Sequence, residues 1–467
     1  MLTATFSAIE VLPEDVLLEI FDFYKLASTT LSWGWDKLAH VCQRWRCIVF
    51  SSQCRLGLRV LCTHDTPVKK TLDCWPTLPI VVRYEGNAKR PPTPPPDDVD
   101  SIVTVLQHRD RVCEIDLILR GSLSEEVSKI MQEPFPLLER LALRSCDDEV
   151  LILPGAVLGG SAPRLSVLHL DGVSFSELPR LLSSASDLVD LQLQRIPNTG
   201  YFSPEALVTG LSATSQLKSL RLDFTSPTSH PNARTSPSPS SGRIVLSALT
   251  TIEFRGSCNY LEDLLSRIST SSLERACIWF FDEPHFDVLQ LAQLLDCVAP
   301  QKLPDKAELL LHNNGTFLAL TRSAGLPPGG LQRAPEWLTL SVQSGLKVSP
   351  MTQICRQIPS FLSSVRTLDI MTSLTPGSDV DPAQWLGLFR VFGSVEKLYV
   401  MWGSVPDVAR ALQLVSADIA VDVLPALREL KFDWLATRWR EAVTSFISAR
   451  QLAGLPPIEF HQPKFSG

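Results

Sequence analysis

His169 and Asp171, separated by one residue, are the pair in this sequence whose types and spacing could support acid–base chemistry. A histidine oriented by a carboxylate can act as a general base. Both residues, however, fall in a stretch whose apolar residues alternate, and this pattern predicts a strand with both side chains on its outward face. We therefore interpret the pair as polar contacts on a recognition surface.

Known catalytic motifs are missing from the sequence. It has no Gly-x-Ser-x-Gly elbow, no phosphate loop ending in Gly-Lys-Ser/Thr, no Gly-x-Gly-x-x-Gly and no His-Glu-x-x-His. The 11 cysteines include no Cys-x-x-Cys pair, and Cys42, Cys47, Cys54, Cys62 and Cys74 are spaced too irregularly for a zinc site. We expect no catalytic activity, no cofactor and no metal, and we interpret these cysteines as buried reduced thiols.

Charge and hydropathy narrow the class of partner. The net charge is −7, and Lys69-Lys70 is the longest basic run, which argues against nucleic acid as the main partner. No apolar run approaches the roughly 18 residues that span a bilayer, so we expect no membrane partner. The odd number of cysteines favours a reducing compartment, the cytoplasm or the nucleus.

One pattern recurs from Val112 to the end of the chain: an apolar residue followed three and five positions later by two more. Its clear copies begin at Val112, Leu138, Leu165, Leu188, Leu217, Leu249, Leu273, Val365, Val395 and Leu427. Except between Leu273 and Val365, neighbouring copies start 23 to 32 residues apart. This spacing is close to the repeat length of leucine-rich repeats, roughly 20–29 residues. Each copy predicts a strand and a helix, and such units stack into a solenoid with a curved parallel sheet.

The outward positions of these strands form the candidate binding surface. Because side chains alternate along a strand, the residues between the apolar ones face away from the core. They are mixed in charge with a few aromatic residues, which suits protein recognition. The candidate contacts are Arg140, Arg144, His169, Arg221, Arg255, Trp279 and Tyr399.

The repeats are degenerate. Regular leucine-rich repeats carry Asn or Cys three residues after the last strand leucine. Cys146 fits that place, whereas Val173, Ile196 and Thr225 do not. Weaker copies surround Leu309 and Leu338, and the region 299–335 is the least regular, so the repeat count and register stay open there.

"IWFFDEPHFD" (278–287) is the sharpest local candidate for a partner contact. Its aromatic residues stand beside acids at a strand end and could anchor a partner. In the other interpretation the rings pack inside the solenoid and Trp279 alone is exposed.

Composition divides the chain into a helical domain at 1–60, a connector at 61–111 and the repeat domain at 112–467. The connector ends in "KRPPTPPPDD" (89–98), which predicts an extended, exposed segment because proline removes backbone donors. Within the repeats, the stretch at about 225–242, "TSPTSHPNARTSPSPSSG", lacks apolar side chains, and its composition predicts a disordered loop.

The N-terminal stretch "VLPEDVLLEIFDFY" (11–24) predicts a helix with unusual apolar coverage. Pro13 suits its first turn, where Glu14 and Asp15 complement the positive helix end. A helical spacing places five apolar residues on one stripe, Val16, Leu17, Ile20, Phe21 and Tyr24. Leu18 and Phe23 lie off this stripe, so the helix calls for a second apolar surface besides its own core.

A second helical pattern follows in "LAHVCQRWRCIVFSS" (38–52), and together the two stretches resemble the F-box motif. That motif has Leu-Pro, an amphipathic Leu/Ile helix and then Val-Cys-x-x-Trp. The matching residues are Leu12, Pro13, Val16, Leu17, Ile20, Val41, Cys42, Arg44, Trp45 and Ile48. The whole chain more loosely resembles the F-box-like proteins of mushroom-forming fungi, and the long spacer "KLASTTLSWGWD" departs from the usual motif.

The resemblance implies a partner and a role. F-box domains bind a Skp-family adaptor that connects to a cullin and a RING ubiquitin ligase, while the C-terminal repeats hold a protein substrate. Carried over, the adaptor contacts would be Leu12, Pro13, Val16, Leu17, Ile20, Phe21, Val41 and Trp45. The helices could instead merely cap the first repeat, and the chain would then be a repeat scaffold for protein interactions without a ligase role.

Overall fold

The structure is a computed structural model. It describes residues 12–27, 35–63, 67–84, 95–146, 150–226, 243–283, 285–296, 303–322, 336–345, 347–372, 380–401, 403–433 and 437–461. Most of the loop predicted at about 225–242 lies outside these residues. The chain divides into two compact units, 1–177 and 178–467, which we describe separately.

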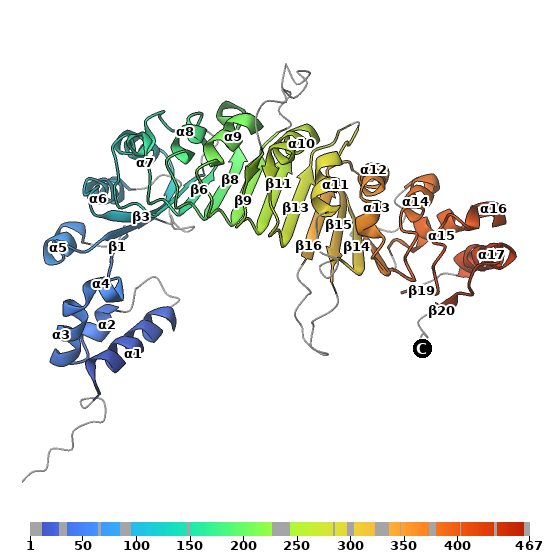
Figure 1. Ribbon diagram of the computed structural model, residues 1–467, viewed down its shortest axis with the longest axis horizontal. Helices are drawn as coiled ribbons and strands as arrows, with labels where there is room; N and C mark the ends of the chain where they lie inside the picture. Colours follow the sequence, from blue (N-terminus) through green and yellow to red (C-terminus); the bar gives the residue numbers. More distant parts are fainter. Residues whose placement is uncertain are drawn as a thin grey trace, which may run out of the picture. The chain divides into compact units, whose positions relative to one another are not determined.

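The first unit starts with short helices and continues as alternating strands and helices (Figure 1). Its helices are α1 (Glu14–Ala27), α2 (Trp35–Ala39), α3 (Gln43–Ser51), α4 (Gln53–Leu56), α5 (Val68–Cys74), α6 (Pro96–Leu106), α7 (Ser122–Ile130) and the 3-10 turn η2 (Val157–Gly160). Its strands are β1 (Val60–Cys62), β2 (Ile80–Tyr84), β3 (Val112–Leu119), β4 (Arg140–Ser145), β5 (Leu151–Ile152), β6 (Val167–Asp171) and β7 (Val173–Ser174).

Strands β1, β2, β3, β4 and β6 of this unit lie side by side in that order, and all are parallel. The register aligns the inward residues of the repeat pattern, so that Ile115 pairs with Leu141 and Leu141 with Leu168. All three side chains are at most 1% exposed. The apolar pairs of successive repeats therefore form one continuous row of the core.

The sheet begins at Val60, whereas we expect a connector as far as residue 111. No apolar residue of β1 or β2 is followed three and five positions later by two more apolar residues. The repeat pattern therefore does not reveal these two strands. Most of the proline-rich segment, 89–94, lies outside the described residues, and its end differs from the expected extended form, because α6 begins at Pro96. A proline at the first helical position loses no hydrogen bond, and Asp97 and Asp98 favour the helix start.

The second unit carries the remaining elements. Its helices are α8 (Leu178–Leu182), η3 (Asn198–Gly200), α9 (Pro204–Leu211), α10 (Cys258–Arg267), α11 (Leu289–Asp296), α12 (Ser349–Gln357), α13 (Pro359–Leu362), α14 (Pro382–Phe389), α15 (Val405–Gln413), α16 (Ala417–Ala420) and α17 (Thr437–Leu452). Its strands are β8 (Asp190–Ile196), β9 (Ser219–Phe224), β10 (Ile244–Val245), β11 (Thr251–Gly256), β12 (Ile268–Ser269), β13 (Arg275–Phe280), β14 (Lys306–His312), β15 (Gly315–Thr321), β16 (Glu336–Val342), β17 (Thr367–Thr372), β18 (Lys397–Val400), β19 (Glu429–Phe432) and β20 (Glu459–His461).

The strand order in this unit is β8-β9-β11-β13-β16-β15-β14-β17-β18-β19-β20. Helices α8, α9 and α10 lie along one side of strands β8 to β13 (Figure 1). Among the described strands of this unit, only the β14–β15–β16 segment breaks the parallel pattern, since β15 is antiparallel to both neighbours. The weak copies at Leu309 and Leu338 are thus both strands, but the later one, β16, is the neighbour of β13.

Both units combine a parallel sheet with helices and have the strand–helix order of a leucine-rich-repeat-like solenoid. In the described part of the chain, no helix has the length and apolar character needed to cross a bilayer.

Gly315 at the start of β15 has no room for a side chain. A Cβ built on it would clash with the backbone carbonyl oxygen of Val342 on β16. We expect Gly315→Ala to cost about 3 kcal/mol of unfolding free energy, the upper end for overpacking, because backbone cannot yield as a side-chain tip can. Thermal unfolding measures the loss, and Gly393→Ala is the control, since its Cβ would meet only Pro425 at 4.0 Å. Equal stability of the two variants would contradict this account of the β15–β16 pairing.

Candidate functional site

Helix α1 packs through one face onto the other N-terminal helices. Leu17 and Phe21 are 0% exposed and Leu18 is 4% exposed. The ring of Phe21 meets that of Trp45 edge-on, with 4.8 Å between the centroids. The guanidinium of Arg44 donates to the carbonyl of Leu12, which fixes the start of α1 against α3. These contacts form the small apolar core of the N-terminal helices.

A second face of α1 is apolar and exposed. Val16 is 42%, Ile20 40%, Phe23 71% and Tyr24 37% exposed. Their spacing of four, three and one residues places all four on one side of a helix. We call these four residues the α1 stripe. Exposed apolar groups concentrated on one helix face are typical of interaction surfaces.

The predicted adaptor contacts therefore divide into two sets. The exposed set consists of Pro13, Val16, Ile20 and Val41, the last of which is 57% exposed. Leu12 and Trp45 are half-buried, so a partner could reach only part of each. Leu17 and Phe21 differ from the prediction, because they are fully buried among the protein's own helices and are not available to a partner. The sequence pattern did not assign Phe23 to the exposed face, although its position off the expected stripe was the available signal.

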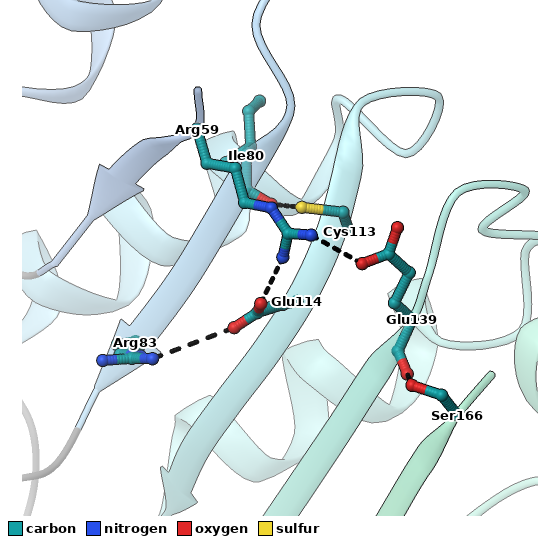
Figure 2. A network of polar contacts seen from close by, with 7 residues as sticks. All are labelled: Arg59, Ile80, Arg83, Cys113, Glu114, Glu139 and Ser166. Atoms are coloured by element: carbon teal, nitrogen blue, oxygen red, sulfur yellow. Dashed lines mark hydrogen bonds and ion pairs between the residues drawn. The ribbon is translucent and has the colours of Figure 1, made fainter. Parts of the chain in front are cut away.

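The segment that leads from these helices into the sheet is held by an ion-pair network (Figure 2). Arg59, just before β1, binds the carboxylate of Glu114 on β3 and that of Glu139, the latter at 2.7 Å. Arg83 Nη2 lies 3.8 Å from the second oxygen of Glu114. Burial alone would lower the pKa of Arg59, but the neighbouring groups, Glu114 and Glu139 among them, raise it. Arg59 thus ties the segment after α4 to β3 and to the residue just before β4.

On the first unit's sheet face, the predicted pair of His169 and Asp171 lies on β6. The Nε atom of Arg144, on the neighbouring strand, is 3.3 Å from Asp171, and the two residues pair in the strand register. Arg140 lies earlier on β4, partly buried. Asp171 therefore acts here as an ion-pair partner between strands.

Three predicted contacts of the second unit, Arg221, Arg255 and Trp279, meet in one open groove of about 240 Å³. Strands β9, β11 and β13 supply them, and Gln343, just after β16, also lines the groove. Arg221 Nη1 lies 3.1 Å from Glu253, and Arg255 Nε lies 3.9 Å from Asp223. The wall of the groove thus consists of two ion pairs, with no net charge, beside the indole ring of Trp279.

The aromatic stretch at 278–287 contributes only Trp279 to this groove. Phe280, Phe281 and Phe286 are 0%, 5% and 5% exposed, while Trp279 is half-buried. The interpretation in which the other rings pack inside is confirmed. The buried Phe281 ring has a second role, because the Arg255 guanidinium lies 5.9 Å from its centroid.

Tyr399 belongs to a different cluster, on β18. Its hydroxyl donates to Glu429 at 3.2 Å, and Lys431 Nζ lies 5.6 Å from its ring centroid. Nearby on the sheet, Lys306 lies 2.7 Å from Asp369. Burial raises the pKa of Asp369, and Lys306 only partly opposes that shift. The predicted contacts therefore do not form a single site.

The described cysteines are exposed or buried, except Cys277, which is half-buried; the side chain of Cys54 lies outside the described residues. Cys42, Cys47 and Cys74 are exposed, contrary to the expectation of buried thiols, and Cys62 is buried. The Sγ atom of Cys42 instead accepts a hydrogen bond from the backbone N–H of Trp45, so Cys42 caps the N-terminus of α3. Among the described residues, no three His, Cys, Asp or Glu side chains are grouped as metal ligands.

Thiol labelling should follow this division. Burial raises the pKa of Cys258 and of Cys355 to about 12. At pH 8 only about one molecule in ten thousand then carries the reactive thiolate at either position. We expect iodoacetamide at pH 8 to label the exposed Cys42 and Cys146 in the folded chain, and Cys258 and Cys355 only after denaturation. Peptide mass spectrometry measures this, and equal labelling of Cys258 and Cys146 would contradict it.

No protein-family model matches the chain, and no curated protein matches it. The leucine-rich-repeat-containing protein LegL7 from Legionella pneumophila is 14% identical with a TM-score of 0.24, over 79% of this chain and 96% of that chain. TLR13 in its complex with ssRNA13 is 11% identical with a TM-score of 0.28, over 87% of this chain and 50% of that chain. Values this low carry no argument, so the leucine-rich-repeat-like arrangement rests on the apolar spacing and strand register.

Proposed function

We propose that this chain is the substrate-recruiting F-box subunit of a cullin–RING ubiquitin ligase of the SCF type. The N-terminal helices bind a Skp-family adaptor, and the repeats hold a protein substrate. The chain itself performs no catalysis; it brings the substrate near enzymes that other subunits supply. The observation that carries the proposal is the α1 stripe, an exposed apolar helix face within a segment that resembles the F-box motif.

The physical case rests on the division of the α1 side chains. Leu17, Leu18 and Phe21 are the buried apolar side chains of α1, whereas the four stripe residues are 37–71% exposed. Burying a fully exposed apolar side chain contributes roughly 1.5–3 kcal/mol, and each stripe residue contributes the part of this that its remaining exposure allows. The stripe would therefore be the apolar centre of a larger interface. A cap for the first repeat would bury this face against the repeats, whereas the stripe is exposed.

Co-expression of the full chain with a Skp-family adaptor tests the proposal. We expect a complex that co-elutes in size-exclusion chromatography, and we expect Leu12→Ala combined with Pro13→Ala to weaken it. Leu452→Ala is the control, because Leu452 is 82% exposed on α17, far along the sequence. An adaptor that never co-elutes with the wild-type chain would contradict the proposal.

The alternative is a protein-interaction scaffold without a ligase role, which the repeat sheet alone would support. Protein turnover separates the two. Loss of a ligase subunit lengthens the lifetime of at least one protein that the repeats bind, whereas loss of a scaffold leaves those lifetimes unchanged.

A further inference from the structure

A row of side chains runs across seven neighbouring strands on the outward face of the second unit's sheet. The register links each member to the next, from β9 through β11, β13, β16, β15 and β14 to β17. In order, the row is Asp223, Arg255, Trp279, Ser341, Phe317, Leu310 and Met371. Each of these side chains is half-buried, and the residues before and after it in its strand are buried. The exception is Thr372, after Met371, which is half-buried. The row therefore points away from the core.

The row is charged at one end and apolar along the rest. Asp223 and Arg255 lie in the groove with Trp279, and Phe317, Leu310 and Met371 continue beyond Ser341. Strands lie about 4.8 Å apart, so the row spans about 29 Å, the length of about nine residues in an extended chain. A ligand bound along the row would contact charged side chains at one end and apolar side chains along the rest.

The charged end favours an anion over a cation. Arg221 and Arg255 are 37% and 41% exposed, whereas their partners Glu253 and Asp223 are 25% and 17% exposed. The guanidinium groups are therefore what an approaching ligand meets first. Because each is already partly neutralised, a single carboxylate suits this end better than a doubly charged phosphate, which would also face both acids.

We propose that this row binds an extended protein segment that places one carboxylate side chain in the groove beside Trp279 and apolar side chains along Phe317, Leu310 and Met371. The inference rests on the proposed function, in which the repeats hold a protein substrate, and it names the kind of segment recognised. The carboxylate accepts from Arg221 or Arg255, and the apolar side chains cover the exposed part of the row.

Selection from a random 12-residue phage-display library on the immobilised full chain tests this proposal. We expect enriched peptides in which one Asp or Glu precedes or follows a run with several apolar residues. With a synthetic enriched peptide, Arg255→Glu and Met371→Asp should each lower the affinity at least tenfold. Lys397→Glu, on the same sheet face but outside the row, is the matched control.

Changes in the peptide keep the test independent of protein folding. Replacing its acidic residue by Lys should lower the affinity at least tenfold for the wild-type chain. The proposal is overturned if no peptide is enriched, if Arg255→Glu and Lys397→Glu bind alike, or if phosphoserine in the acidic position binds more tightly than glutamate. The assay contains no adaptor, so its failure is distinct from failure of the adaptor to co-elute.

Discussion

The double substitution Ile20→Asp and Phe23→Asp is expected to lower the affinity of the chain for a Skp-family adaptor by about 100-fold or more. Each change removes an apolar anchor and places a charge in a contact that excludes water, and 100-fold corresponds to about 2.7 kcal/mol. Isothermal titration measures the affinity. The two side chains are 40% and 71% exposed, and the substitutions leave the buried Leu17, Leu18 and Phe21 in place.

The matched control for this prediction is Leu452→Asp combined with Val245→Asp. These side chains are 82% and 68% exposed and lie in the repeat region. The control introduces the same two charges, so it separates loss of the α1 stripe from a general effect of charge. Similar affinities of the two double variants would refute the role of the stripe.

Arg450→Leu is expected to destabilise the C-terminal repeats by on the order of 3 kcal/mol, since the carbonyl groups of this turn lose the hydrogen bonds that the buried guanidinium donates. Arg450 is 1% exposed, and its guanidinium donates to the carbonyls of Leu424 at 2.8 Å, Leu427 at 3.0 Å and Pro425 at 3.2 Å. Leu424 has φ +48°, so these bonds hold a strained turn ahead of β19.

Chemical denaturation, with hydrogen exchange of α17 as a local readout, measures this effect. Arg428→Leu is the control, because Arg428 is exposed beside the same turn. An Arg450→Leu chain as stable as the control would show that the turn does not depend on the buried guanidinium.

The apolar spacing predicted most strands because it reports directly on the core. Leu141, Leu168 and Leu220 are inward residues of predicted repeats, and each is at most 1% exposed in a parallel strand. The order of β14, β15 and β16 could not be predicted. In a repeat each strand lies beside the next one along the chain, whereas here β13 is followed in the sheet by β16, β15 and then β14. Leu310 and Phe317 joined the apolar row only through that order.

The predicted sites show the same limit. Residue types and alternation identified Arg221, Arg255 and Trp279, but only the register showed that they share a groove and that Tyr399 does not. On α1, helical spacing grouped Ile20 with Phe21, although burial separates them. An apolar stripe wider than one face cannot show from sequence which side packs inward, because both sides satisfy the same periodicity.

Hydrogen–deuterium exchange of the full chain, with and without a Skp-family adaptor, tests the central claim most directly. Binding that covers the α1 stripe should slow exchange in residues 14–27 by stabilising the N-terminal helices. The account predicts this protection with no change in β11, β13 and β17. Unchanged exchange in α1 at saturating adaptor, or protection confined to the sheet, would contradict it.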